Sequence, residues 1–344
     1  MGLDMTVNRL PARTWNWLKM NESSLKEIEA FGSPEVEFSG KCTDVEWDGF
    51  ETIATGMGED MDRLANVSGA TTIRLTGGES KLHIACTDGQ KNFQKVEILA
   101  EEGECVNVVM DYTSAKEAGG LLAVQTKMRL AKNATVRLVQ VQTLGDGFTL
   151  LNDVGALCAD GAKVEILQLF LGAAKTYSGV LSDLLGEASS LDAKVGYLGR
   201  NEQRVDMNYV ALHKGKKTVS KMTADGVLRD RAFKLFRGTI DFKNGASGAE
   251  GEEREDVLLL GDDVINQTIP LILCAEEDVQ GNHGATIGQL DEETLFYLCS
   301  RGMSEEAATN LISRARIDAL CAKIGDEAVQ TQVQNYLEEV LGNE

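Results

Sequence analysis

Proline is scarce in this sequence, and the signals of a secreted or membrane-spanning chain are missing. Only three prolines stand beside 35 glycines in 344 residues, so glycine, asparagine and aspartate must supply most turns. The N-terminus has no apolar run before a small-residue cleavage site, as a signal peptide would have. No stretch approaches the roughly 18 apolar residues that a membrane helix needs. We therefore expect a cytoplasmic protein that does not act at a membrane.

Positive charge is also in short supply. The chain has 34 Lys and Arg against 54 Asp and Glu, which gives a formal net charge of −20. Proteins that neutralise phosphate groups carry the opposite sign. The composition therefore argues against nucleic acid or anionic lipid as a partner.

The usual catalytic and cysteine motifs are absent. There is no GxxxxGK[ST], GxSxG or HExxH motif, which argues against a P-loop nucleotidase, a nucleophile-elbow hydrolase and a zinc protease of that type. There is no CxxC, and the odd number of scattered cysteines predicts free thiols in a reducing compartment. The seven cysteines are Cys42, Cys86, Cys105, Cys158, Cys274, Cys299 and Cys321.

Both ends of the chain have features of helices. Pro11 could open a helix that carries Trp15, Trp17 and Leu18, and Ser23 or Ser24 could cap a second one before Phe31. At the other end, DEETLFYLCSRG begins with acids and ends in Arg-Gly, and Ser304 could cap the next helix. A third helix is predicted over 327–341.

The middle of the chain, from about 35 to 275, has the two-residue period of β-strands. Segments such as KLHIAC (81–86), AKVEILQLFL (162–171) and RVDMNYVALH (204–213) are rich in β-branched and aliphatic residues. No convincing amphipathic helix separates them, which argues against βαβ units. Turn residues recur at spacings of 28, 25, 29 and 30, at Asn133, Gly161, Gly186, Gly215 and Gly245. This spacing fits the coils of a parallel β-solenoid, although a β-sandwich of hairpins stays open.

Two side chains are candidates for chemistry. His283 lies in the polar, glycine-flanked stretch AEEDVQGNHGATIGQ between the last predicted strand and the helical tail. Glu255 ends an acidic run before the apolar segment DVLLLG. That run is either a solvated face, or it directs Glu255 to one side of a strand as a carboxylate ligand. His83 and His213 lie in strand-like runs and are expected to be structural.

The segment 256–308 resembles the C-terminal signature of the SufB/SufD family of iron–sulfur cluster assembly scaffolds. The resemblance is carried by the unbroken stretch HGATIGQLDEETLFYLCSRGMSEEAA (283–308), by FRGTIDFKNGA (236–246) and by LPARTWNWLKMNE (10–22). It implies a mainly β protein with a right-handed parallel β-helix core and small helical regions at both ends. The implied divisions are an N-terminal helical region (1–35), the β-helix (36–288) and a C-terminal helical domain (289–344).

The resemblance also implies a function and partners. The chain would be a non-enzymatic subunit of the cytosolic SufBCD-type scaffold complex, helping to build and transfer nascent iron–sulfur clusters. Its implied partners are the ABC-type ATPase SufC and a SufB-type sister subunit, or a second copy of itself as a homodimer. Sulfur would arrive by a cysteine desulfurase route. A cluster would be bound transiently in the complex and not stably by this chain alone.

The family's residues carry over unevenly. His283 falls on the histidine of the SufD-type motif, but Gly281 stands where better-known members have cysteine, and Glu255 stands at the cysteine position of SufB-type chains. His283 is therefore the candidate iron ligand, with Glu255 as a second interface candidate, because a carboxylate binds iron but carries no persulfide. The candidate residues for ATPase docking are Leu295, Phe296, Tyr297 and Arg301.

Two other functions stay open at this stage. One is a SufB-like chain that serves as the sole scaffold subunit of a two-component system. The other, more remote, is a carbohydrate-active β-helix enzyme with paired acids in a groove.

Overall fold

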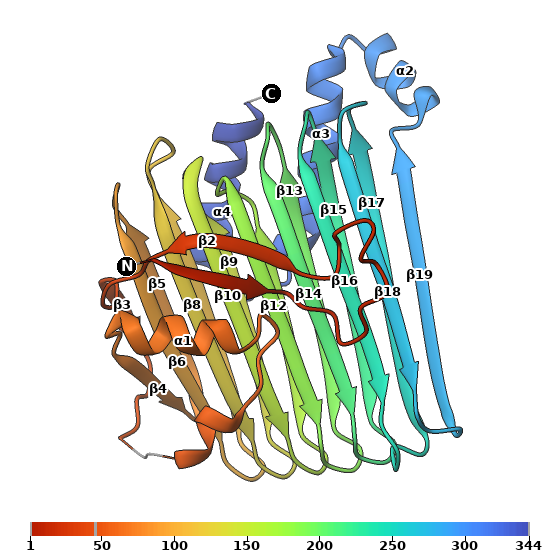
Figure 1. The fold of residues 1–344 in the computed structure, drawn as a ribbon. Coiled ribbons are helices and arrows are strands. Elements are labelled where there is room, and N and C mark those ends of the chain that lie inside the picture. The colour runs from red at the N-terminus through yellow and green to blue at the C-terminus, as the bar shows by residue number, and fades with distance from the viewer. Residues whose placement is uncertain (1, 45–46, 343–344) are drawn as a thin grey trace.

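The computed structural model describes residues 2–44 and 47–342, and its body is a parallel β-solenoid of about seven turns (Figure 1). Each coil contributes one strand to each of two facing sheets, so that a strand pairs with the strand two places further along the chain. The β-solenoid predicted from the turn spacing is confirmed, and the β-sandwich alternative is wrong.

One sheet contains the even-numbered strands, and all of its neighbouring strands are parallel. Its strands are β4 (Thr72–Thr76), β6 (Lys91–Ala100), β8 (Gly119–Leu130), β10 (Gly147–Cys158), β12 (Lys175–Leu184), β14 (Arg204–His213), β16 (Phe233–Phe242) and β18 (Ile265–Cys274).

The other sheet contains odd-numbered strands, and only β3 in it runs antiparallel to its neighbour. Its strands are β3 (Val36–Ser39), β5 (Gly78–Cys86), β7 (Cys105–Ser114), β9 (Thr135–Thr143), β11 (Lys163–Phe170), β13 (Ser190–Gly199), β15 (Val219–Arg229), β17 (Ala249–Leu260) and β19 (Val279–Gln289).

Strands in the middle of the solenoid are buried on both faces. In β9, Val136 and Leu138 belong to the core between the sheets, whereas Val139 and Val141 pack against the C-terminal helices. Parallel strands covered on both faces have near-continuous apolar runs, which explains why segments such as 162–171 show little alternation.

The turn residues stack from one coil to the next. A Cβ atom on Gly186 would lie 2.0 Å from the backbone nitrogen of Asp160, and one on Gly215 would lie 2.2 Å from the carbonyl oxygen of Gly186. Asn133 and Gly161 adopt positive φ angles of 57° and 65°, a conformation that favours glycine and asparagine. The regular spacing of turn residues in the sequence therefore reflects the close stacking of coils.

The helical region predicted over residues 1–35 is wrong. The structure has an antiparallel hairpin instead, formed by β1 (Leu3–Val7) and β2 (Ser23–Ile28). Met5, Val7 and Leu25 are buried against the outer face of the even-numbered sheet. In a strand, alternate side chains point to the same face, so every second residue of β1 and β2 packs on the sheet. These strands therefore show the two-residue period as well.

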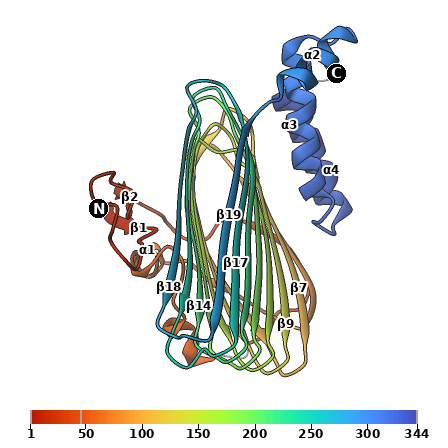
Figure 2. The ribbon, with the colours of Figure 1, turned by 90° about the vertical axis from the view of Figure 1, so that its right-hand side faces the viewer.

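A helix in the next segment was also missed. The 3₁₀ helix η1 (Asp48–Thr52) and the helix α1 (Glu59–Ser68) precede β4. In α1, Met61, Leu64 and Ala65 pack on the same outer face as the hairpin. Figure 2 shows the hairpin and α1 on one side of the solenoid and the C-terminal helices on the other.

A buried ion pair anchors the hairpin. Arg237 and Asp206 are fully buried, with Nη1 and Oδ1 2.6 Å apart. Arg237 also donates to the carbonyl of Met20, while Asp206 accepts from Asn8 and Ser23. The guanidinium of Arg237 opposes desolvation and holds the pKa of Asp206 below its ordinary value. Asp206 and Arg237 therefore hold the N-terminal segment in place, and they meet only because β14 and β16 are neighbours in the folded sheet.

Three helices end the chain: α2 (Glu292–Ser300), α3 (Glu305–Cys321) and α4 (Glu327–Leu341). The predicted cap of Ser304 is confirmed, since its hydroxyl accepts from the backbone N–H of Ala307. Helices α3 and α4 cover the odd-numbered sheet, and Val333 and Leu337 are fully buried there. Within the described residues, no helix has the length and apolarity to cross a membrane.

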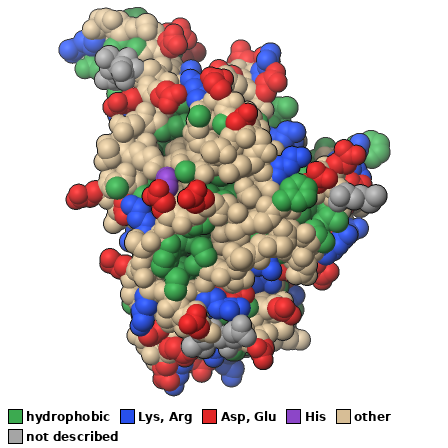
Figure 3. All heavy atoms as spheres, turned by 90° about the vertical axis from the view of Figure 1, so that its left-hand side faces the viewer, with side chains coloured by type: hydrophobic (Ala, Val, Ile, Leu, Met, Phe, Trp, Pro, Cys, Tyr) green, Lys and Arg blue, Asp and Glu red, His purple; other side chains and the backbone are tan. Residues whose placement is uncertain are grey.

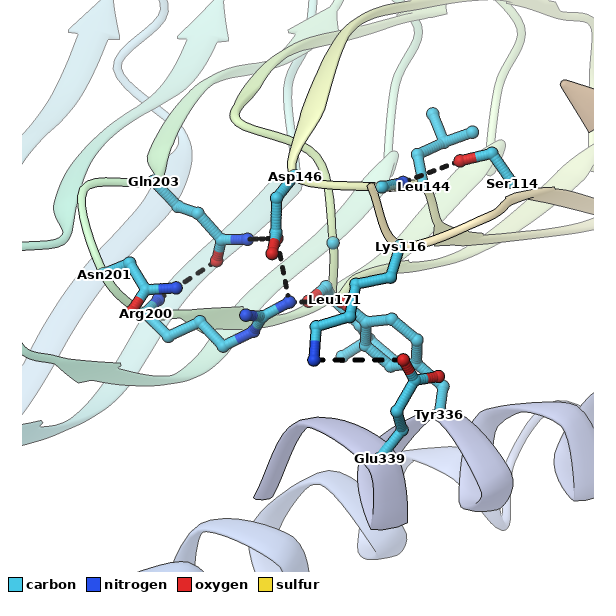
Figure 4. A network of polar contacts seen from close by, with 12 residues as sticks. Ser114, Lys116, Leu144, Asp146, Leu171, Arg200, Asn201, Gln203, Tyr336 and Glu339 are labelled. Atoms are coloured by element: carbon cyan, nitrogen blue, oxygen red, sulfur yellow. Dashed lines mark hydrogen bonds and ion pairs between the residues drawn. The ribbon is translucent and has the colours of Figure 1, made fainter. Parts of the chain in front are cut away.

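Polar contacts fix α4 on the coil turns (Figure 4). Arg200 donates to Asp146 at 3.0 Å and to the hydroxyl of Tyr336 at 2.9 Å. The Tyr336 hydroxyl in turn donates to the carbonyl of Leu171. These contacts tie the tail to three successive turns, so α4 is part of the solenoid's packed body.

The two ends of the solenoid differ. At the N-terminal end, shown from outside in Figure 3, the short antiparallel strand β3 covers β5, and Cys42 bridges to Leu75 of β4. At the C-terminal end, no strand in residues 2–44 or 47–342 pairs with the outer edges of β18 and β19. Figure 2 looks onto this end and shows β19 uncovered.

The Asp206–Arg237 pair gives a first prediction. Asp206→Ala should lower the free energy of unfolding by about 3–5 kcal/mol, because it leaves a buried guanidinium without its carboxylate. Urea unfolding measures the change. Asp192→Ala, which removes the partly exposed pair with Lys194, is the control and should cost no more than about 1 kcal/mol. Equal losses in the two variants would contradict the anchoring role of Asp206.

Candidate functional site at the open end of the solenoid

The candidate site is built on the last two coils, where β16, β17, β18 and β19 meet. In β17 burial alternates: Gly251, Glu253 and Glu255 point between the sheets, and Glu250 and Glu252 are exposed. Of the two alternatives for the acidic run, a solvated face is therefore wrong for Glu253 and Glu255, and Glu255 points to one side of a strand as the other alternative predicted. Because β17 continues the β-solenoid, half of its side chains must face the interior, whatever their charge.

Glu255 is held by a lysine from the facing sheet. Lys234 of β16 donates to its carboxylate, and Thr268 of β18 donates to the other oxygen at 2.6 Å. Lys234 also donates to the Thr268 hydroxyl at 2.9 Å. Burial lowers the pKa of Lys234, and the charge of Glu255 opposes that shift. The pair thus joins the two sheets one coil behind the open end.

Glu253 lies beside this pair with less support. Its carboxyl group packs over Gly238, where a Cβ atom would come within 2.3 Å of it, and its Oε2 has no hydrogen-bond partner among the described residues. Burial, reinforced by the charge of Glu255 and opposed by Lys234, raises the pKa of Glu253 to about 8. The raised pKa favours the protonated, neutral form of Glu253, which limits the cost of burying it.

His283 is placed on an edge strand and not in a connecting loop. It lies within β19, in register with Glu253 of β17, and its side chain is exposed. Residues in register on parallel strands project from the same face of a sheet, so His283 extends the row of Glu253 to the open end. The prediction that the strands before 275 are the last ones is wrong, because β19 follows them.

Two further positions complete the open end. Cys274, which the sequence analysis left unassigned, ends β18 and is exposed. Gly281 faces the interior, where a Cβ atom would lie 3.0 Å from Ile272. Within the part of the chain that the structure describes, no three His, Cys, Asp or Glu side chains gather closely enough to hold a metal ion.

The sequence did not reveal Lys234, Thr268 or Glu253 as members of one cluster. Lys234 stands in FKLFRGTIDF between two apolar residues, and nothing local marks it as the partner of Glu255. One signal was available. Glu253, Glu255 and Val257 are two residues apart in β17 and point to the same face, and Val257 is a core residue. His213 is buried as expected, and its ring nitrogens lie 2.7 and 2.8 Å from the hydroxyls of Thr218 and Ser220.

Three residues predicted to dock an ATPase, Leu295, Phe296 and Tyr297, lie on α2, which contains no buried residue, and Arg301 follows as its C-cap. Phe296 is 76% exposed, Tyr297 is exposed, and Leu295 is half-buried. The guanidinium carbon of Arg301 lies 5.1 Å from the centre of the Tyr297 ring. Phe296 therefore does not pack on the end of the solenoid, and α2 extends beyond the strand ends (Figure 1).

The chain matches the family described as SUF system FeS cluster assembly, SufBD core domain, over residues 83–316. That span exceeds half of the chain and includes the coils, the open end and most of α3. The chain therefore belongs to the SufBD core family, which confirms the resemblance in its sequence.

Individual relatives agree with this family. The chain is 28% identical over 248 residues to the iron-sulfur cluster assembly protein SufD of Bacillus subtilis (strain 168), covering 72% of this chain and 57% of the relative. It is 27% identical over 228 residues to the SufBD family protein SSP1857 of Staphylococcus saprophyticus, covering 66% and 49% respectively. The chain thus spans about half the length of the curated relatives it matches.

The raised pKa of Glu253 gives a second prediction. The folded state keeps its proton up to about pH 8, whereas the unfolded state releases it near pH 4.5. This contribution to stability is complete below pH 4.5 and is lost as the pH rises to 8. The variant Glu253→Gln has no carboxyl group to ionise. Its free energy of unfolding, relative to that of the native protein, should therefore be higher at pH 9 than at pH 5 by on the order of 2–4 kcal/mol.

Urea unfolding of both proteins at the two pH values measures this effect. Glu252→Gln is the control, since Glu252 is exposed on the same strand, and its effect should hardly change with pH. A Glu253→Gln effect that is the same at both pH values would refute the buried, protonated carboxyl group.

Proposed function

We propose that this chain is a scaffold subunit of a Suf-type assembly complex, in which a second SufB/SufD-type chain docks on the open end and a nascent iron–sulfur cluster is held between them. The observation that carries the proposal is the edge strand β19, which bears His283 and has no pairing partner on its outer side within residues 2–44 and 47–342. An unpaired strand edge offers a row of N–H and C=O groups to another chain.

The composition of β19 supports docking on this edge. Natural edge strands are protected by lysine, proline, bulges or short length. The eleven residues of β19, VQGNHGATIGQ, include no proline and no Lys, Arg, Asp or Glu. By contrast, β18 carries Pro270, and the opposite end of the solenoid is covered by the short strand β3. Of the two strands at the open end, β19 therefore has the less protected edge among the described residues, and it is the one that carries His283.

The site suits a partner role in cluster assembly. A neutral imidazole is a ligand for iron, and His283 is exposed on the docking edge. Glu255 is less available, because Lys234 and Thr268 already bind its carboxylate. We propose that the remaining ligands come from the sister chain, including the thiolate that Gly281 does not supply. In isolation the chain would form a homodimer through the same edge.

The acids of β17 do not support a carbohydrate-active enzyme. A glycosidase needs two carboxyl groups that flank a bound sugar. Glu253 and Glu255 are both almost fully buried, against Gly238 and Lys234. We therefore propose a role without chemistry of its own at these acids, in which an ATPase partner of the SufC type supplies the energy.

The test of the proposed site is the cluster content of the reconstituted complex. His283→Ala should lower iron and acid-labile sulfide per complex by about half or more, because a ligand is lost, while the fold is kept. His83→Ala is the matched control: His83 is half-exposed near the other end and lies 2.5 Å from Asp111. Unchanged cluster content in His283→Ala, or an equal loss in His83→Ala, would contradict the site.

ATPase docking on α2 is tested separately. Helices α3 and α4 are part of the packed body, so removing the whole tail would expose the outer face of the odd-numbered sheet. Phe296→Asp should instead weaken binding of a SufC-type ATPase about tenfold or more, as loss of an exposed aromatic anchor does. Calorimetry measures the dissociation constant. Phe31→Asp, an exposed phenylalanine elsewhere, should leave it unchanged, and equal effects would argue against docking on α2.

A further inference from the structure

The tryptophan loop, residues 11–20, joins the two N-terminal strands and presents aromatic surface to solvent. The Trp17 side chain is 96% exposed, and Trp15 and Leu18 are also exposed. The chain has only three tryptophans, and two of them stand in these ten residues. Exposed tryptophan is rare because of its large apolar surface, and it is enriched at the centres of protein interfaces.

The tryptophan loop is held in shape by its own hydrogen bonds. The backbone N–H of Trp15 donates to the side chain of Asn21, whose amide donates to Asn16. The backbone N–H of Lys19, a residue with a positive φ of 54°, donates to the carbonyl of Asn16. The turn at 16–19 thus carries Trp17 on a fixed backbone.

The tryptophan loop lies beside the open end of the solenoid. Its flanking residues Leu10 and Met20 are buried against Leu235 of β16 and Ile269 of β18. Strand β18 is the last strand of the even-numbered sheet, and Figure 1 shows the loop over β16 and β18. Any chain that pairs with the free edges of β18 and β19 therefore approaches Trp17.

Charge identifies the kind of chain that fits. The loop and its flanks carry three cations, Arg9, Arg13 and Lys19, and one acid, Glu22, which pairs with both arginines, so the segment keeps a net positive charge in a protein with a net charge of −20. The turns before and after β18, at its two ends, are acidic instead, with Asp262, Asp263, Glu276, Glu277 and Asp278. A second copy of this chain brings such acidic turns to the same end, so its charge complements the loop.

We propose that the tryptophan loop is the apolar clamp of this docking site, and that Trp17 is buried against a second copy of the chain when the two copies meet at their open ends. The proposal rests on the proposed function, which places a second chain on β18 and β19. It adds a side-chain anchor that lies outside the strand edges.

Two single-tryptophan chains test the clamp directly. One keeps Trp17 (Trp15→Phe with Trp47→Phe), and the other keeps Trp47 (Trp15→Phe with Trp17→Phe). Trp47 serves as the control because it packs at the opposite end, with its ring centre 5.1 Å from that of Phe50. As the concentration rises through the dimer dissociation constant, Trp17 emission should shift to shorter wavelength and acrylamide quenching should fall about twofold or more. Trp47 should show neither change, and a Trp17 signal that is constant across dimerisation would overturn the clamp.

Sedimentation equilibrium separates the clamp from the strand edge. Trp17→Ser should weaken dimerisation about tenfold or more, whereas Phe31→Ser, another exposed aromatic residue, should not. Gly284→Lys places a charge on β19, where a side chain has open space, and should weaken dimerisation through the edge. Val67→Lys on α1 is its control.

Each outcome has one meaning. Dimerisation that is lost in Gly284→Lys and kept in Trp17→Ser refutes the clamp and leaves edge pairing intact. Loss in Trp17→Ser alone supports the clamp and refutes pairing along β19. A native chain that is monomeric at high micromolar concentration refutes both, and equal weakening by Phe31→Ser refutes the clamp.

Discussion

The backbone hydrogen-bond ladder between successive coils is the constraint on which this structure depends. Each coil pairs with the coil before it and the coil after it, strand by strand in parallel register. Such a ladder has two ends, and each end leaves backbone groups without a strand partner. The chain covers its N-terminal end with the antiparallel strand β3 and leaves β18 and β19 open. The asymmetry gives the fold a direction and makes the last coil the natural place for another chain.

Buried charge is concentrated in the coils next to that open end. Strand β16 contributes to two buried ion pairs. Lys234 points between the sheets to Glu255, and Arg237 points to the outer face of the sheet, to Asp206. The inner pair joins the two sheets, and the outer pair fastens the N-terminal segment that carries the tryptophan loop. Buried pairs add little net stability, but breaking one is costly. The two pairs thus fix the relative positions of β17, β18 and the N-terminal segment next to the open end.

Family membership and structure bear on different questions. The SufBD core match covers residues 83–316, and the site proposed for cluster assembly falls within it. The tryptophan loop lies outside the matched residues, so its proposed role is argued from exposure, position and charge alone.

The sequence by itself determined the β-strands of the body, because the two-residue period is a local property that every coil repeats, and its resemblance to a known family chose the solenoid over the sandwich. It also determined the caps of the tail, where Asp291 and Ser304 bind the first N–H groups of their helices. Only the tertiary structure decided the N-terminal hairpin, since Met5, Val7 and Leu25 are buried by packing against strands far away in the sequence. Likewise, Glu255 became a buried partner of Lys234, and not a solvated acid, through packing between strands far apart in sequence. His283 entered a strand because β17 offered a free edge to a polar, glycine-rich segment with little strand preference of its own.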